Sequence, residues 1–239
     1  MTWRGYLVTL VLAAGCQTVD EAAPLAAAVK TAHARMQIRA EAARTMQEAI
    51  AIGDLAGAHT QAVLVAALRD PDVLQEWRPY LDSVRTTAQT IATTADTVAA
   101  AKAAGELGQR CGACHEASGA RIKLGPIPAA PAGSTLAAQM AGHQWAASRM
   151  WEGLTTPSTE RWQAGVVALS RARWTIAAEE PSLTRSPISD DVARVRLLAE
   201  RGLAAETLDA RGALYGEILA TCAHCHATIR DASPRTPSP

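Results

Sequence analysis

The chain has 239 residues, enough for one large domain or two small ones, and its 23 basic residues are balanced by 23 acidic ones. This balance argues against a nucleic-acid-binding protein, which needs an excess of Lys and Arg against the phosphates. Aromatic residues make up only 4%, Phe is absent and Ala is abundant, which favours closely packed helices over sheets. We therefore expect an all-α fold.

The N-terminal residues have the features of an export signal. Arg4 supplies a positive start, and an apolar run over 6–14 leads to small residues before Cys16. The segment Leu12-Ala13-Ala14-Gly15-Cys16 resembles a bacterial lipoprotein signal, in which the sulfur of the cysteine carries lipid after cleavage. The resemblance implies a signal peptide over 1–15 and a protein anchored in the bilayer through Cys16, on the periplasmic side of a bacterial membrane. Ordinary cleavage nearby, which would leave Cys16 unmodified, is the alternative.

Two helices are predicted first in the mature chain. The first spans 19–53, where apolar residues recur at alternating spacings of four and three. Asp54 then has the character of an N-cap for a second helix, which runs to about Leu68. The segment Asp70-Pro71-Asp72 interrupts the helical pattern.

A third helical stripe covers 74–91, and Asp96 is expected to start a fourth helix that runs through Cys111. The segment 119–134 contains six Gly and Pro residues, a density that no helix survives. We interpret it as a linker.

The helical pattern then recurs. The stripe that contains Met140 and Met150 repeats the one that contains Met36 and Met46 at an offset of 104 positions. Such self-similarity indicates an internal duplication of a four-helix unit.

The remaining elements of the second half are expected at matching places. Helix two starts near Ser158, helix three covers 192–203, and helix four begins near Leu208. A loop over 180–190 accommodates the extra length of this half, and the Pro- and Ser-rich segment 231–239 is expected to be disordered.

These elements predict two tandem antiparallel four-helix bundles, because short loops between consecutive helices make antiparallel neighbours. The expected domains are 16–118 and 135–230. Each one ends on the helix that carries its cysteine pair.

The motif Cys-x-x-Cys-His occurs twice, as Cys111-Gly112-Ala113-Cys114-His115 and as Cys222-Ala223-His224-Cys225-His226. On a helix, positions i and i+3 share a face, so two thiols can add to the two vinyl groups of one haem. The following histidine can then bind the iron. The motifs predict two covalently bound haem c groups, held by Cys111, Cys114, Cys222 and Cys225, with His115 and His226 as iron ligands.

Disulfides and zinc sites are the alternative interpretations of these cysteine pairs. Cysteines three apart on a helix make poor disulfides. A structural zinc site gathers four ligands, commonly on short loops.

The sixth position of each iron needs a ligand from the opposite side. In a bundle with haem on helix four, helix one is a natural source, and Met36 and Met140 occupy matching places there. His143 lies one turn from Met140 and is the alternative ligand for the second iron. Because four methionines cannot all bind two irons, we expect Met46 and Met150 to pack the core.

A haem motif on the last helix of a four-helix bundle resembles cytochrome c-prime and its low-spin relatives. These proteins commonly show Met-x-x-His-Phe on helix one, with the Met on the distal face of the haem. This sequence has Met36-Gln37-Ile38-Arg39 and Met140-Ala141-Gly142-His143, so the first copy replaces His by Arg39. Neither copy has the Phe.

The predicted function is electron transfer by a dihaem carrier whose two haems form a short relay. Its partners would be redox proteins or a membrane redox complex. No nucleophile with an adjacent base, phosphate-binding loop or paired carboxylates stands out, so we do not expect an enzyme. The alternative is c-prime-like binding of NO or CO, which requires an open distal side.

Overall fold

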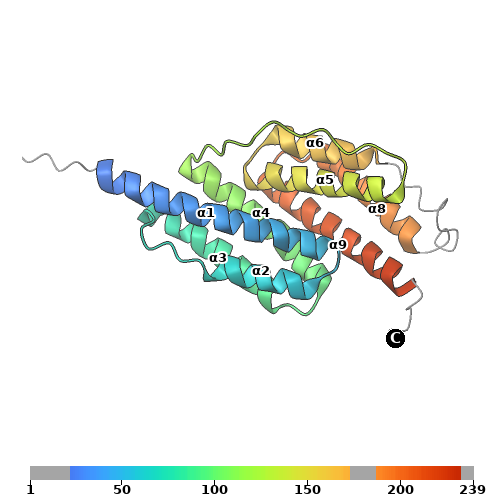
Figure 1. Ribbon diagram of the computed structural model, residues 1–239, viewed down its shortest axis with the longest axis horizontal. Coiled ribbons are helices and arrows are strands. Elements are labelled where there is room, and N and C mark those ends of the chain that lie inside the picture. Colours follow the sequence, from blue (N-terminus) through green and yellow to red (C-terminus); the bar gives the residue numbers. More distant parts are fainter. Residues whose placement is uncertain (1–21, 173–186, 233–239) are drawn as a thin grey trace, which may run out of the picture.

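The computed structural model describes residues 22–172 and 187–232, and every regular element in these ranges is helical. The all-α prediction is confirmed for this part of the chain. Figure 1 shows the helices packed side by side along the long axis of the molecule, with α1 entering at one end and α9 leaving at the other. None of the described helices is long and apolar enough to cross a membrane.

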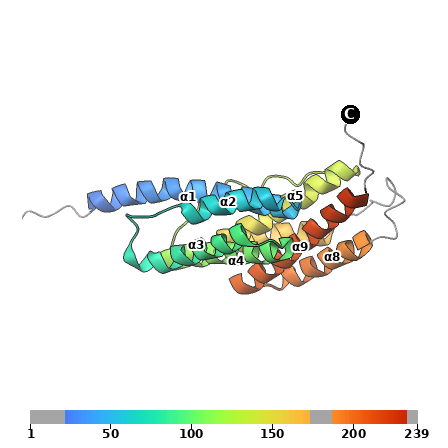
Figure 2. The same ribbon diagram turned by 90° about the horizontal axis from the view of Figure 1, so that it is seen from below.

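The first half consists of α1 (Ala22–Ala51), α2 (Leu55–Ala67), the short 3₁₀ helix η1 (Gln75–Trp77), α3 (Arg78–Thr93) and α4 (Thr97–Ser118). Two predicted N-caps are confirmed. The carboxylate of Asp54 accepts from the Gly57 amide, and that of Asp96 accepts from the amides of Val98 and Ala99. Figure 2 shows α1 and α2 in one layer above α3 and α4.

The third helix begins later than its stripe predicts, because Leu74 stands outside the helix and is 37% exposed. Pro79 lies in the first turn of α3, where its missing N–H costs no hydrogen bond. The buried side of α3 still carries the predicted residues Leu81, Val84 and Ile91.

The predicted linker is confirmed as non-helical between α4 and α5. Gly119 ends α4 in the left-handed conformation, with φ of 64°, which favours glycine over residues with a Cβ. The side chain of Thr135 accepts from the Ala138 amide and caps the next helix.

The second half consists of α5 (Leu136–Thr155), α6 (Thr159–Ser170), α8 (Pro187–Leu203) and α9 (Leu208–Ala232). A helix was predicted to start near Ser158, and the Ser158 side chain caps α6 by accepting from the Arg161 amide. The predicted loop over 180–190 extends too far, because α8 already begins at Pro187 and a helix tolerates Pro at its start. The rest of that loop lies outside the described residues. The tail was predicted from 231, and α9 continues to Ala232.

The two halves pack together through α4 and α9, which cross at glycines. A Cβ added to Gly105 would lie 2.2 Å from the Gly212 carbonyl oxygen and 2.8 Å from the Gly216 nitrogen, while one added to Gly112 would meet Leu208 at 3.2 Å. Later residues of α4 thus contact earlier residues of α9, so the two helices are antiparallel. Their backbones lie too close for any larger side chain between them.

A single buried cluster contains residues from both halves of the chain. Met46 and Ile50 of α1 belong to it together with Met150 of α5 and Ile218 of α9, and all four side chains are 0% exposed. Met46 and Met150 therefore pack the core, as predicted. In this cluster the C-terminal parts of α1 and α5 flank the crossing of α4 and α9.

Candidate functional site: two cysteine-histidine motifs at opposite ends

The two Cys-x-x-Cys-His motifs lie in the C-terminal turns of α4 and α9, as the sequence predicts. We call Cys111, Cys114 and His115 the first site. Cys222, Cys225 and His226 are the second site. All six side chains are buried or half-buried, and the four thiols are free of disulfides.

The two motif histidines make the same kind of hydrogen bond. His115 Nδ1 lies 2.7 Å from the carbonyl oxygen of Thr155, and His226 Nδ1 lies 2.8 Å from that of Ala51. A carbonyl oxygen can only accept a hydrogen bond, so each Nδ1 carries a proton, and in the neutral ring Nε2 is then the nitrogen with the lone pair. This tautomer leaves Nε2 able to bind a metal, and a backbone carbonyl is a common partner for a metal-binding histidine.

The two hydrogen bonds occupy equivalent places in the two copies, and each one joins a residue of one half to a residue of the other. Thr155 ends α5 and Ala51 ends α1, and these two residues are related by the 104-residue offset between the copies. The first helix of each half therefore orients the histidine of the other half. Sequence reasoning did not anticipate this exchange.

Burial makes the cysteine pairs poor nucleophiles. It raises the pKa of Cys111 and of Cys222 to about 12, and that of Cys225 to about 11. It also lowers the pKa of His115, which favours the neutral imidazole that a metal requires. Thiols with raised pKa values are weak in disulfide exchange, which requires the thiolate.

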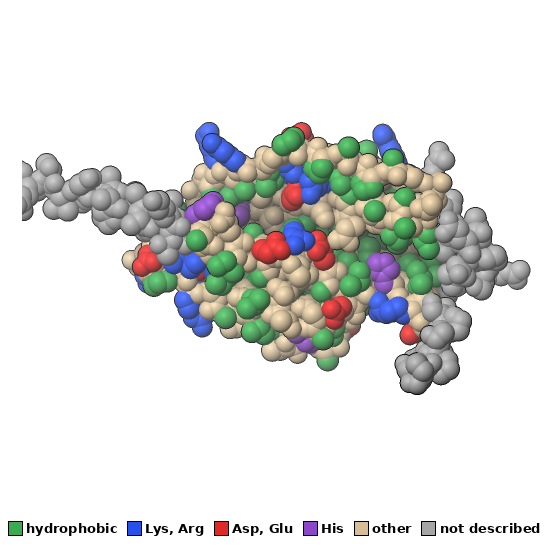
Figure 3. All heavy atoms as spheres, in the orientation of Figure 1, with side chains coloured by type: hydrophobic (Ala, Val, Ile, Leu, Met, Phe, Trp, Pro, Cys, Tyr) green, Lys and Arg blue, Asp and Glu red, His purple; other side chains and the backbone are tan. Residues whose placement is uncertain are grey.

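The second site lines a cavity of about 240 Å³. Met140 and His143 of α5 and Cys222, Cys225 and His226 of α9 all border this cavity. Figure 3 shows hydrophobic and histidine side chains around a hollow at the right-hand end of the molecule. Burial, and then the neighbouring His226, lower the pKa of His143 to about 4, so this imidazole is neutral at pH 7. Both candidate distal ligands therefore lie beside the predicted haem attachment residues.

The first site lies against the N-terminal part of α1. Met36 is half-buried there, and its sulfur accepts a hydrogen bond of 3.5 Å from Arg39 Nη1. Arg39 is 4% exposed, and its charge is close enough to Cys111 and Cys114 to favour their thiolates against the stronger effect of burial. The structure thus brings Met36 and Arg39 to the first site, in the places that Met140 and His143 take at the second.

Arg39 forms a buried ion pair that the sequence analysis missed. Its Nη2 lies 2.8 Å from Asp70, and Arg35 Nε lies 3.0 Å from the same carboxylate. Asp70 was interpreted only as part of a helix-breaking segment. The available signal was the pair of arginines four apart on an apolar stripe, because buried arginines require an acidic partner.

The antiparallel register of α4 and α9 separates the two sites. His115 lies ten residues beyond Gly105, and His226 lies ten residues beyond Gly216, in opposite directions from the crossing. At 1.5 Å per residue, the two histidines are roughly 30 Å apart along the helix axes. The two sites therefore lie farther apart than expected for the short relay that the sequence suggested.

The zinc alternative lacks a ligand set in residues 22–172 and 187–232, where no cluster of three or more His, Cys, Asp or Glu side chains could hold a metal ion. His224, inside the second motif, points to solvent with a 58% exposed side chain. Cys16, the predicted lipid attachment residue, lies outside the described residues. No protein-family profile, curated protein or solved structure matches this chain.

Proposed function

We propose that this chain is a dihaem c-type cytochrome that transfers electrons. The observation that carries the proposal is the matched tautomer of His115 and His226, each with Nδ1 bound to a carbonyl and Nε2 open to a metal. Each histidine follows a pair of helical thiols, which is the donor set of a covalent haem. Two matched copies in a duplicated chain support this interpretation over coincidence.

The residues present fit one haem in each half. Cys111 and Cys114 would form the thioether bonds of the first haem, and Cys222 and Cys225 those of the second. Met140 and His226 both line the cavity beside Cys222, which supports Met140 as a distal ligand, with His143 as the alternative. Met36 would occupy the same place at the first haem. A bound haem would supply one-electron redox chemistry, and these residues would hold it.

The two haems would serve opposite ends of the molecule. With sites roughly 30 Å apart along the helix pair, a redox partner at one end meets one haem first, because tunnelling rates fall steeply with distance. In the proposed setting the partners are periplasmic redox proteins or a membrane redox complex. Lipid on Cys16 would hold the cytochrome beside them, and its architecture would be two bundles joined at α4 and α9.

The deciding experiment is mass spectrometry of the mature protein produced with haem-attachment machinery. We expect two covalent haem additions for the natural sequence. The double variant Cys111→Ala/Cys114→Ala should carry one haem, and so should Cys222→Ala/Cys225→Ala. A haem-free natural protein would contradict the proposal, whereas loss of both haems in only one double variant would indicate that one site depends on the other.

A visible spectrum of the reduced protein with and without carbon monoxide separates electron transfer from gas binding. We expect low-spin spectra and little carbon monoxide binding in the natural protein. If both haems bind carbon monoxide at rest, the c-prime-like gas-binding function replaces the electron carrier.

A further inference from the structure

The duplication places different charges at equivalent positions beside the two sites. Arg35 and Arg39 of α1 correspond to Gln139 and His143 of α5 at the offset of 104. Arg35 and Arg39 carry permanent positive charges, whereas Gln139 is uncharged and position 143 has no guanidinium group. The two equivalent sites therefore differ in the charge of the residues beside them.

The first site has an excess of buried positive charge. The side chains of Arg39, Arg35 and Asp70 are 4%, 14% and 2% exposed, so two guanidinium groups share one buried carboxylate. Asp72 lies 3.6 Å from Arg35, but its side chain is 52% exposed and water screens its charge. Arg39 Nε and Arg35 Nη2 are buried and have no hydrogen-bond partner among the described residues. The cluster therefore retains about one uncompensated cation.

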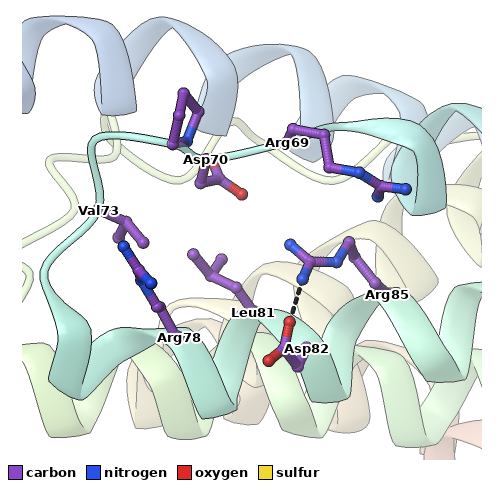
Figure 4. Close-up of a pocket in the computed structure, with 8 residues that line it drawn as sticks. Arg69, Asp70, Val73, Arg78, Leu81, Asp82 and Arg85 are labelled. Carbon is purple, nitrogen blue, oxygen red and sulfur yellow. Dashed lines mark hydrogen bonds and ion pairs between the residues drawn. The ribbon is translucent and has the colours of Figure 1, made fainter.

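This cation lies beside the predicted ligand of the first haem, because Arg39 Nη1 contacts the sulfur of Met36. Three more arginines line a cavity that Asp70 also borders. This cavity of about 440 Å³ is lined by Arg69, Arg78 and Arg85, with Asp82 paired to Arg85 (Figure 4).

The second site has the opposite balance. Among the described residues that line its cavity, Asp191 is the one carboxylate, and there is no Lys or Arg. The side chain of Asp191 is 12% exposed, and its Oδ2 lies 2.8 Å from Nδ1 of the exposed His224. The nearby Arg230, which donates to the Ile52 carbonyl, is exposed to solvent. Its charge is therefore screened more strongly than that of Asp191.

Resting on the proposed dihaem function, we propose that the haem at Cys111 and Cys114 has the higher reduction potential and is reduced before the haem at Cys222 and Cys225. Oxidation adds one positive charge to the iron centre. The buried cation of the Arg35–Arg39–Asp70 cluster opposes that charge, whereas the buried carboxylate of Asp191 stabilises it. The charge difference between the halves would thus give the carrier two distinct redox sites.

A redox titration of the two-haem protein, followed by its absorption spectrum at fixed pH, tests this proposal. We expect two one-electron transitions. The variant Cys111→Ala/Cys114→Ala retains only the second haem, and Cys222→Ala/Cys225→Ala retains only the first. The protein with only the first haem should titrate at the higher potential. The reverse order would overturn the proposal.

Charge variants test the cause of the difference. Arg39→Gln should lower the reduction potential of the first haem and leave that of the second nearly unchanged. Arg39→Lys keeps the positive charge, so the potential of the first haem should stay close to that of the natural protein. In either variant Arg35 can still pair with Asp70, so the buried carboxylate keeps a cationic partner. The control is Arg44→Gln, which removes an equal charge from the same helix at a position where Arg44 is exposed and pairs with Glu41 and Glu48.

The second haem has a matched pair of variants. Asp191→Asn should raise its potential, and Asp190→Asn, which removes the same charge from an exposed neighbouring residue, should leave it unchanged. A bis-His second haem would also have a lower potential, so the Arg39 and Asp191 variants decide whether charge contributes. Two covalent haems with unshifted potentials in both variants would refute this inference, whereas the absence of haem from the protein would refute the proposed function itself.

Discussion

His226 and Ala51 lie 175 positions apart in the chain, yet the imidazole Nδ1 of His226 donates a hydrogen bond of 2.8 Å to the Ala51 carbonyl. His115 and Thr155 form the equivalent contact in the opposite direction between the halves. Each hydrogen bond fixes the ring orientation of a predicted iron ligand from outside its own half. The two halves are therefore joined at the histidines of both motifs as well as through their core.

The distal ligands can be tested by substitution. Met36→Ala and Met140→Ala should each open one haem to carbon monoxide and lower its potential, because a neutral thioether favours ferrous iron. Optical titration with carbon monoxide on the single-haem backgrounds measures this effect. If His143→Ala opens the second haem while Met140→Ala does not, then His143 is the ligand there.

The buried methionines should affect stability rather than ligand binding. Met46→Ala and Met150→Ala each remove a fully buried side chain, and we expect a loss of roughly 2–5 kcal/mol in the free energy of unfolding. Chemical denaturation measures the loss. Ile38→Ala is the control, since Ile38 lies on the same helix as Met46 and is 56% exposed. Carbon monoxide binding to folded Met46→Ala protein would indicate that Met46 acts at the haem instead.

The crossing of α4 and α9 should not tolerate a methyl group. Gly105→Ala would place a Cβ 2.2 Å from the Gly212 carbonyl oxygen, so the helices must separate at a cost of about 1–3 kcal/mol. Thermal unfolding should show the decrease. Gly142→Ala is the matched control, because nothing lies within 4 Å of its added Cβ and alanine favours a helix by up to about 1 kcal/mol. Equal stability of the two variants would show that the crossing is looser than described.

If Cys16 carries lipid, the mature protein should associate with membranes. Acyl chains on Cys16 would hold it in the bilayer at about 0.8 kcal/mol for each buried CH₂ group. Cys16→Ser should release the protein in soluble form or block its maturation, as judged by fractionation and detergent partitioning. Natural protein found free in the periplasm would rule the anchor out.

Local features were predictable because the interactions that define them are local. Asp54, Asp96 and Ser158 cap helices through contacts within three residues, and the apolar stripes follow from helix periodicity. The two Cys-x-x-Cys-His motifs were recognisable for the same reason, because about one turn of helix holds all their candidate donors. The offset of 104 also revealed which residues of the two halves are equivalent.

The partners of those residues depended on the tertiary structure. Gly105 and Gly216 allow the close approach of two helices, but a glycine does not specify which helix fills the space beside it. The antiparallel crossing of α4 and α9 moves the two motifs to opposite ends of the molecule and brings the end of α1 to His226. Likewise, the charge of Arg39 was evident from the sequence, whereas its burial against Asp70 was not. Contacts between residues far apart in the chain arise from the packing of whole helices, which no local pattern encodes.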